Sequence, residues 1–318
     1  MGVEAGPEPP FTFDLGRGPV VLAAHQARLT GRETPNSLLS VAACAASGAA
    51  RVELDVTFTA DGEPVISHER ELRVGGRRVP ADEVDSKDVP AVPRLWEAVQ
   101  LLRPTAAVLQ VDLKLFRPIR AQEVERLAAV VAPLQPRVIV GSQAHWNLRP
   151  LARAGLTVGF DPTLHFRYVP PGAPKAWARG LPRKTGVWGF RDDSPLAQEF
   201  AASASSYFAA RFEDILGLVP QVSELMVDYG TVLRLGELGF ALGPALRDRG
   251  VALAAWTVRS YEGGTTLHLV HRLAELGVST VITDVPLLLG QALRGEGSVL
   301  VRELRYQGAT ATSPSLLG

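Results

Sequence analysis

Two stretches of the sequence carry polar or charged residues at every second position within otherwise apolar segments. Glu53 and Asp55 occur in Val-Glu-Leu-Asp-Val, and Gln110, Asp112 and Lys114 occur in Leu-Gln-Val-Asp-Leu-Lys-Leu. Because residues i and i+2 of a β-strand share a face, each strand directs its polar side chains to one side and its apolar ones to the other. Two neighbouring strands of this kind bring three carboxylates and one ammonium group together.

Such a cluster of carboxylates requires a compensating positive charge, because desolvation and mutual repulsion oppose their ionisation. A divalent cation supplies that charge, and a site with only oxygen donors favours Mg²⁺ or Ca²⁺ over Zn²⁺. We therefore expect Glu53, Asp55 and Asp112 to bind one divalent cation. The alternative is a cluster of ion pairs, in which Lys114 neutralises the acids without a metal.

Two histidines follow predicted strands in the same part of the chain. His25 ends the first strand, and His68 ends a short segment that follows the tight turn Thr59-Ala-Asp-Gly. This turn folds the segment back toward the first pair of carboxylates. Imidazole titrates near neutral pH, so two histidines can serve as a general base and a general acid. We expect His25 and His68 to flank one substrate; the alternative is that they form structural hydrogen bonds. The other four histidines are predicted to be surface residues: His145, His165, His268 and His271.

Short β-branched runs alternate with helical patterns along the whole chain, as in proteins built from βα units with a parallel sheet. There are eight such runs: Val20–His25, Arg51–Val56, Val108–Lys114, Arg137–Val140, Leu156–Phe160, Glu224–Asp228, Val251–Val258 and Thr280–Thr283. Eight strands predict a (β/α)8 TIM barrel of the α/β class, formed as a single domain. An open, doubly wound sheet is less favoured because no Gly-rich phosphate loop follows the first strand.

The helical patterns have recognisable ends and define the domain organisation. They cover Asn36–Ser47, Arg94–Leu102, Ala121–Ala132 and Thr265–Leu276, each followed by a Gly or Pro. We expect a flexible N-terminus over residues 1–16, the barrel over 17–295, and a C-terminal extension over 296–318 whose end is disordered. Residues 161–221 are too long for an ordinary βα connection and predict a lid-like insertion over the barrel mouth, with a helix near Ser194–Leu216.

Composition excludes several classes of partner. Hydrophobic residues make up 46% of the chain, and 33 basic residues balance 33 acidic ones, so no global positive field attracts nucleic acid. The first ten residues lack the pattern of a secretory signal, and no apolar run reaches the roughly 20 residues of a membrane span. We expect a cytoplasmic protein without a transmembrane segment. The single cysteine, Cys44, excludes a disulfide within the chain and predicts a buried apolar position.

Eight short motifs, in order along the chain, resemble those of the glycerophosphodiester phosphodiesterases. That family has His-Arg-Gly, Glu-Asn-Thr, Glu-x-Asp-Val, Thr-x-Asp-Gly, His-Asp, Glu-x-Lys, Trp-Thr-Val-Asn and Thr-Asp-x-Pro. This chain has His25-Gln-Ala, Pro35-Asn-Ser, Glu53-Leu-Asp-Val, Thr59-Ala-Asp-Gly, His68-Glu, Asp112-Leu-Lys, Trp256-Thr-Val-Arg and Thr283-Asp-Val-Pro. The resemblance extends from about Val20 to Leu289.

The resemblance implies roles for the candidate residues. It implies that the three carboxylates bind a metal, that His25 and His68 form the acid/base pair, and that Lys114 and Trp256 lie near the phosphate. Gln26 stands where the family has an Arg that contacts phosphate, Pro35 replaces a Glu, and Asp112 is one methylene shorter than the family Glu. Related sphingomyelinase D-type phospholipases also have Asp-x-Lys and lack His-Arg-Gly, so these changes are compatible with metal binding.

The implied activity is metal-dependent hydrolysis of a glycerol-based phosphodiester. The substrate is either a deacylated glycerophosphodiester, which yields sn-glycerol 3-phosphate and an alcohol, or a lysophospholipid. Phospholipase D-like action on a lysolipid or sphingolipid, and an inactive barrel that binds phosphodiesters, are the alternatives. Aromatic residues in the insertion either shelter an acyl chain or form a small core: Phe166, Tyr168, Trp177, Trp188 and Phe190.

Overall fold

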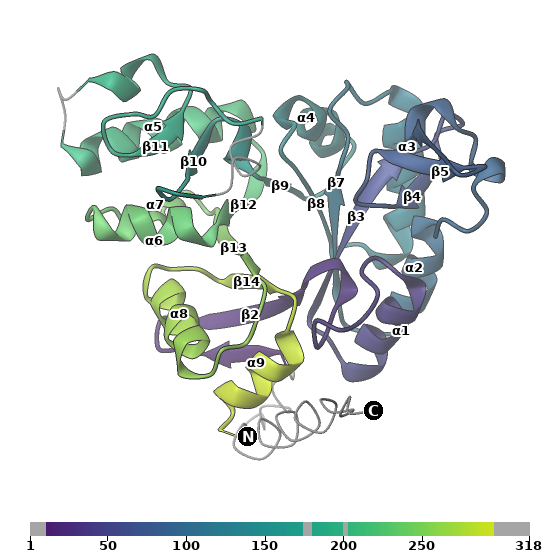
Figure 1. The fold of residues 1–318 in the computed structure, drawn as a ribbon, viewed down its shortest axis with the longest axis horizontal. Helices are drawn as coiled ribbons and strands as arrows, with labels where there is room; N and C mark the ends of the chain where they lie inside the picture. Colours follow the sequence, from purple (N-terminus) through teal and green to yellow (C-terminus); the bar gives the residue numbers. More distant parts are fainter. Residues whose placement is uncertain (1–10, 174–179, 200–202, 296–318) are drawn as a thin grey trace, which may run out of the picture.

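The computed structural model describes residues 11–173, 180–199 and 203–295, and its centre is a ring of parallel strands (Figure 1). Each of the eight predicted runs forms one of these strands. They are β2 (Pro19–Ala24), β3 (Arg51–Phe58), β7 (Val108–Leu113), β8 (Val138–Ser142), β9 (Val158–Phe160), β12 (Val222–Asp228), β13 (Ala252–Val258) and β14 (Thr280–Thr283). Neighbouring strands of this set are all paired in parallel.

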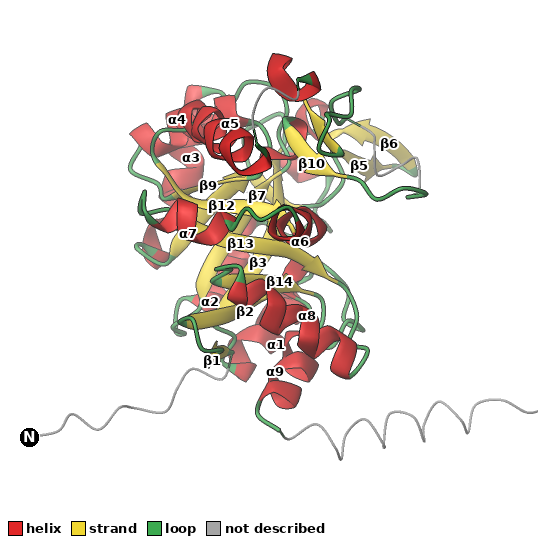
Figure 2. Cartoon of the chain, turned by 90° about the vertical axis from the view of Figure 1, so that its left-hand side faces the viewer, coloured by secondary structure: helices red, strands yellow, loops and turns green. Residues whose placement is uncertain are grey.

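The ring is closed, because β2 pairs with β14 on one side and with β3 on the other. Closure confirms the predicted (β/α)8 barrel and rules out the open, doubly wound sheet. In Figure 2 the barrel strands lie in the middle, with helices such as α4 (His145–Arg153), α7 (Leu242–Arg247) and α8 (Gly264–Glu275) outside them. Since the strands are parallel, all their carboxyl ends meet at one face of the barrel, which is called the mouth here.

The helices begin and end close to the residues that their sequence patterns predicted. Ser37 accepts a hydrogen bond from the Ser40 amide at the start of the first helix, and Gly48 ends it with a φ of 71°. The α-helices are α1 (Leu38–Ser47), α2 (Leu95–Leu102), α3 (Ala121–Val131), α4 (His145–Arg153), α5 (Ala204–Leu218), α6 (Tyr229–Glu237), α7 (Leu242–Arg247), α8 (Gly264–Glu275) and α9 (Pro286–Leu293). Short 3-10 helices include η1 (His25–Ala27), η2 (Ala81–Glu83), η3 (Ser86–Asp88), η4 (Ala132–Leu134), η5 (Pro162–Leu164) and η7 (Pro195–Gln198). No helix among these described residues is both long and apolar enough to cross a membrane.

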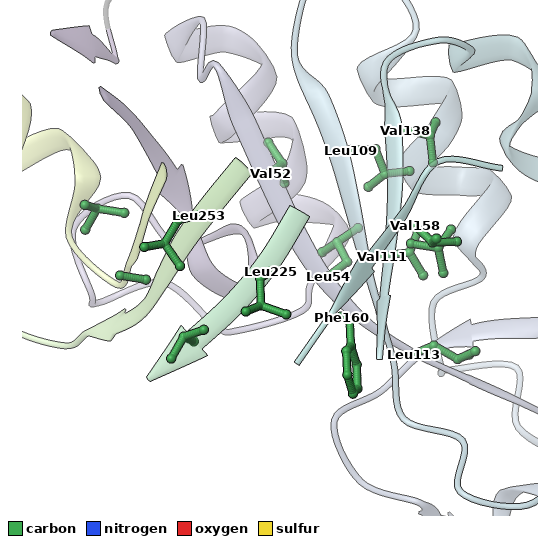
Figure 3. Packing of buried hydrophobic residues seen from close by; sticks show 14 of the residues in the cluster. Val52, Leu54, Leu109, Val111, Leu113, Val138, Val158, Phe160, Leu225 and Leu253 are labelled. Atoms are coloured by element: carbon green, nitrogen blue, oxygen red, sulfur yellow. The ribbon is translucent and has the colours of Figure 1, made fainter. Parts of the chain in front are cut away.

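The apolar residues of the barrel strands form the main core. Val52 and Leu54 of β3 are fully buried, as are Leu109 and Val111 of β7, and Figure 3 shows them in the same cluster as Leu225 of β12. These positions alternate with Glu53, Asp55, Gln110 and Asp112, as the two-residue period predicted. Core packing against the helices therefore fixes the direction of the charged side chains.

Polar and small residues fill the barrel interior below the mouth. The Arg51 guanidinium donates to the Glu224 carboxylate (2.9 Å) and to Gln110 (2.9 Å), and all three residues are buried. The Met226 side chain lies so close to Gly141 and Gly159 that a β-carbon would come within 2.8 Å and 2.2 Å of it. Side chains thus fill the barrel interior below the mouth.

Three additions extend the barrel. The short strand β1 (Thr12–Asp14) pairs with β2, so the chain joins the sheet before residue 17, where the barrel was expected to begin. Strand β4 (Pro64–Ile66) folds back along β3 after the predicted turn, in which Gly62 has a φ of 78°. A hairpin of β5 (Glu71–Val74) and β6 (Arg77–Pro80) follows it.

The predicted insertion contains a two-stranded hairpin, β10 (Phe166–Tyr168) with β11 (Phe190–Asp192), followed by α5. Phe166 and Phe190 are 1% exposed and stack with ring centroids 4.6 Å apart, and Phe208 and Phe212 of α5 pack around them. These aromatic rings therefore form a packed core and are not available to an acyl chain. Trp177 lies outside the described residues.

Candidate active site

A cavity of about 200 Å³ lies at the barrel mouth and is lined by most of the predicted site residues. They are His25, Glu53, His68, Asp112, Lys114 and Trp256. A second cavity of about 700 Å³, called the outer groove here, shares Trp256, Thr257 and Arg259 with the first. Residues of α6 and α8, such as Leu233 and Leu269, form its walls. The two cavities therefore adjoin.

The three carboxylates lie together as predicted. In the pairing of β3 with β7, Asp55 is opposite Asp112 and Glu53 is opposite Gln110. One oxygen from each of Glu53, Asp55 and Asp112 lies within 4.8 Å of the other two. The side chains of Glu53 and Asp55 are 3% and 1% exposed, and that of Asp112 is 32% exposed. The cluster is thus open to the cavity on the Asp112 side.

Burial and mutual repulsion govern the protonation of this cluster. Burial raises the pKa of Glu53 well above its ordinary value, and the charges of Asp55 and Asp112 raise it further. Burial also acts to raise the pKa of Asp55, but the Lys114 ammonium and the Asn36 hydrogen bond outweigh it, so this pKa is lowered. Glu53 is therefore the acid that most lacks a compensating positive charge.

Lys114 neutralises only part of the cluster. Its Nζ lies 2.6 Å from Asp112 Oδ2 and 2.9 Å from Asp55 Oδ1. Although burial disfavours the ammonium form, the three neighbouring carboxylates raise the pKa of Lys114, so it remains charged. Glu53 Oε1 is buried and has no hydrogen-bond partner among the described residues. One ammonium beside three acids, with one orphaned oxygen, is an arrangement that fits a bound divalent cation better than a complete set of ion pairs.

The loop after β2 holds two of the carboxylates in place. Gln26 and Ala27 both adopt left-handed backbone conformations, with φ of 52° and 57°. This conformation, which costs roughly 1–2 kcal/mol for a non-Gly residue, directs the Gln26 amide N–H to Glu53 Oε2 (2.7 Å). Asn36 donates to Asp55 Oδ2 (2.8 Å) and accepts from the Asp55 amide. Such strain at successive residues is typical of a functional loop.

Gln26, predicted to bind substrate, is engaged elsewhere in this structure. Its side-chain amide donates to Asp55 Oδ2 at 2.6 Å, and Gln26 does not contribute to the lining of the cavity. The side chain therefore orients a candidate metal ligand. A neutral donor suits this position, because a second cation beside Lys114 would compete with a metal for Asp55.

His25 is held by a residue that the sequence analysis did not assign. His25 Nδ1 lies 2.6 Å from Asp284 Oδ1, and the Asp284 side chain is 6% exposed and also pairs with Arg28 at 3.3 Å. Because an ionised carboxylate only accepts hydrogen bonds, we assign the proton to Nδ1. The other nitrogen, Nε2, is then an acceptor, and it lies 4.0 Å from Glu53 Oε2.

His68 contributes to the same cavity from the segment after β4. Its side chain is 60% exposed, its Nδ1 lies 3.5 Å from Glu69 Oε1, and the Ser67 amide is bonded to the Asp55 carbonyl. The predicted return of this segment to the mouth is confirmed. The two histidines therefore differ, since one is fixed and partly buried while the other is solvated.

Trp256 stands between the two cavities. Its indole N–H donates to the Met226 carbonyl at 3.3 Å, and the guanidinium of Arg167 lies 5.1 Å from its ring centroid. Arg167 also pairs with Asp228 at 3.3 Å. Trp256 is thus fixed at the site, with Arg167 of the insertion packed on it.

Several polar residues at the site were not predicted. Asp161, after β9, accepts hydrogen bonds from Gln143 and the Thr163 amide, and burial raises its pKa to about 6. Asn36 belongs to the Pro35-Asn-Ser motif and Asp284 to the Thr283-Asp-Val-Pro motif. These motifs were the sequence signal that could have identified the two residues. His145 and His165 were expected on the surface, but both are half-buried, so that expectation was wrong. His145 Nδ1 lies 3.2 Å from His165 Nε2, within hydrogen-bond distance.

Comparisons with known proteins agree with this architecture. Residues 25–150 match the model of the glycerophosphoryl diester phosphodiesterase family. The match spans both histidines, the three carboxylates and Lys114, so it confirms the resemblance and supports phosphoric diester hydrolase as the enzyme class.

Solved structures of the family share the fold over most of the chain. A glycerophosphodiester phosphodiesterase from Parabacteroides distasonis is 14% identical, with a TM-score of 0.58 over 87% of this chain and 98% of that one. One from Thermotoga maritima is 17% identical, with a TM-score of 0.54 over 86% and 98%. An Oleispira antarctica phosphodiesterase, solved in complex with sn-glycerol-3-phosphate, is 18% identical, with a TM-score of 0.52 over 86% and 96%. No curated protein matches the sequence. At these identities the likeness establishes the fold.

Proposed function

We propose that this protein hydrolyses glycerol-based phosphodiesters at the barrel mouth, with His25 and His68 as the acid/base pair. One observation carries the proposal: both histidines line a single cavity with Glu53, Asp112 and Lys114. General acid/base groups and a cluster of carboxylates around one small space are what phosphodiester cleavage requires.

The environment of each histidine suggests its role. His25 Nε2 is an acceptor directed to the site, and Asp284 stabilises the imidazolium that forms when this nitrogen takes a proton. His25 therefore removes the proton from the oxygen that attacks phosphorus. His68 lines the same cavity and is 60% exposed, so it takes the other role and donates a proton to the leaving alkoxide as the P–O bond breaks.

Glu53, Asp55 and Asp112 would hold one divalent cation, Mg²⁺ or Ca²⁺. When bound, the cation supplies positive charge to the phosphoryl oxygens, where negative charge grows during the reaction. Asn36 and Gln26 orient Asp55 toward this task through hydrogen bonds of 2.8 and 2.6 Å. Lys114 lowers the pKa of Asp55 and thus keeps this carboxylate able to act as a ligand, and it also pairs with Asp112 at 2.6 Å.

A glycerophosphodiester is the substrate class that the observations support best. The family match supports it, and so does the relative solved with sn-glycerol-3-phosphate. The small cavity fits a phosphoryl group and glycerol, while the outer groove offers space for the alcohol. The packed aromatic rings of the insertion give no support to an acyl site there.

Phosphorus NMR tests the proposal directly. The full chain is incubated with glycerophosphocholine, glycerophosphoethanolamine or lysophosphatidylcholine, with Mg²⁺, Ca²⁺ or a chelator. We expect the diester resonance of the two deacylated compounds to be replaced by that of sn-glycerol 3-phosphate, with either metal and not with chelator.

A double variant, His25→Ala with His68→Ala, serves as the control for contaminating enzymes. Wild-type protein that cleaves none of the diesters with either metal, although it binds sn-glycerol 3-phosphate, would identify an inactive binding barrel. Faster cleavage of lysophosphatidylcholine than of both deacylated compounds would move the substrate class to lysolipids.

A further inference from the structure

The catalytic cavity has few positive groups for a substrate that carries a negative charge. Among the described residues, its lining includes the carboxylates of Glu53, Asp112 and Asp161 but only two permanently basic side chains, Lys114 and Arg259. Lys114 is committed to Asp55 and Asp112 at 2.9 and 2.6 Å. The side chains that line this cavity therefore present more acids than cations to a phosphodiester, and a divalent cation held by the carboxylates would offset only part of this excess.

Other cations at the mouth are also engaged with carboxylates. Arg28 pairs with Asp284 at 3.3 Å, and Arg167 pairs with Asp228 at 3.3 Å while its guanidinium lies over Trp256. Arg259 differs from both, because no carboxylate among the described residues lies within 4.0 Å of its guanidinium. Its side chain is exposed, and its planar donors are available for a ligand.

The location of Arg259 matches the expected location of a phosphodiester. It directly follows β13 at the mouth, and it lines both the catalytic cavity and the outer groove, together with Trp256 and Thr257. A substrate with its glycerol phosphate in the first cavity and its alcohol in the second must pass this junction. Guanidinium binds phosphate oxygens through two parallel hydrogen bonds, which neutral side chains cannot match.

We propose that Arg259 is a substrate-binding residue that holds the phosphodiester at the junction of the two cavities. This inference rests on the proposed function for the identity of the substrate. Gln26 cannot provide the missing positive charge, because it is neutral and its amide is bonded to Asp55. Arg259 directly follows β13, which β14 alone separates from β2 in the barrel, so it can approach the phosphate from the side of the mouth next to the loop after β2.

The test compares Arg259→Gln and Arg259→Lys with wild type in the full chain. Calorimetry gives the Kd of sn-glycerol 3-phosphate with Mg²⁺ present, and steady-state kinetics give KM and kcat for glycerophosphocholine. We expect Arg259→Gln to raise Kd and KM by about tenfold or more, as the loss of a charged hydrogen bond implies. Arg259→Lys should raise Kd and KM less, because lysine keeps the positive charge but lacks the two parallel N–H donors of the guanidinium. We expect kcat to change much less, since the contact exists before and during the reaction.

Arg247→Gln is the matched control. Arg247 is exposed and lies near the opposite end of β13, and its replacement by Gln removes the same charge. Arg259→Gln with the same Kd and KM as this control, and a normal Tm, would overturn the inference while leaving the proposed function intact. Wild type that cleaves nothing but binds sn-glycerol 3-phosphate in an Arg259-dependent way would support the inference and overturn the proposed function. If Arg259→Gln lowers the Tm, Arg259→Met replaces it in the test. A Kd and KM in Arg259→Met equal to those of wild type would then overturn the inference.

Discussion

Replacing His25 or His68 with Ala is expected to lower kcat on glycerophosphocholine by a factor on the order of 10²–10⁴, because each change removes one proton-transfer group. Both side chains line the cavity, and neither belongs to the buried apolar core, so the Tm should change little. The measurement is kcat with saturating Mg²⁺, together with a thermal melt of each variant.

His271→Ala is the matched control, since His271 is exposed on α8 and does not line either cavity. Its kcat should equal that of wild type. Near-normal turnover in His25→Ala or His68→Ala would refute the role of the histidine concerned.

Replacing Asp55 with Asn is expected to weaken metal binding by about 100-fold or more, since even the loss of a residue that only orients a ligand costs about 10–100-fold. Asp55 is the most buried of the three acids, and Asn36, Gln26 and Lys114 all contact it. In wild type, a metal at 100 times its Kd should stabilise the fold by about 2.7 kcal/mol and raise the Tm accordingly. In Asp55→Asn the same metal concentration should stabilise the fold by about 0.4 kcal/mol or less, so most of the rise in Tm should be lost.

Thermal melts across a titration of Mg²⁺ and Ca²⁺ measure this effect. Asp85→Asn is the control, because the Asp85 side chain pairs with the exposed Lys87 and lies outside the carboxylate cluster. It should retain the full rise in Tm. If wild type shows no rise with either metal, or Asp55→Asn shows the same rise as wild type, the three carboxylates do not bind the cation.

The barrel could be predicted from the sequence because its signals are local. Each strand is a short β-branched run between turn or helix signals, and the alternation within β3 and β7 determines which side chains face the mouth. Val52 and Leu54 are buried in the core. Because successive side chains of a strand point to opposite faces, Glu53 and Asp55 must then face the barrel interior. The direction of these acids thus depends on residues next to them in the chain.

The parts that escaped prediction depend on contacts between distant segments. Asp284 meets His25 across 259 positions of the chain, and no local pattern indicates that pair. Gln26 was expected to face a substrate, but two successive left-handed residues direct it to Asp55 instead. In the insertion, the choice between an acyl site and a core depended on whether Phe166 and Phe190 meet α5, which only the tertiary structure reveals.

A crystal structure with Mn²⁺ and sn-glycerol 3-phosphate would test the central claim most directly, because the anomalous signal of manganese locates the ion independently of any model. We predict one ion bound by Glu53, Asp55 and Asp112, with the phosphate between His25 and His68. An ion bound elsewhere, or Lys114 bridging all three carboxylates with no ion at the mouth, would contradict the claim.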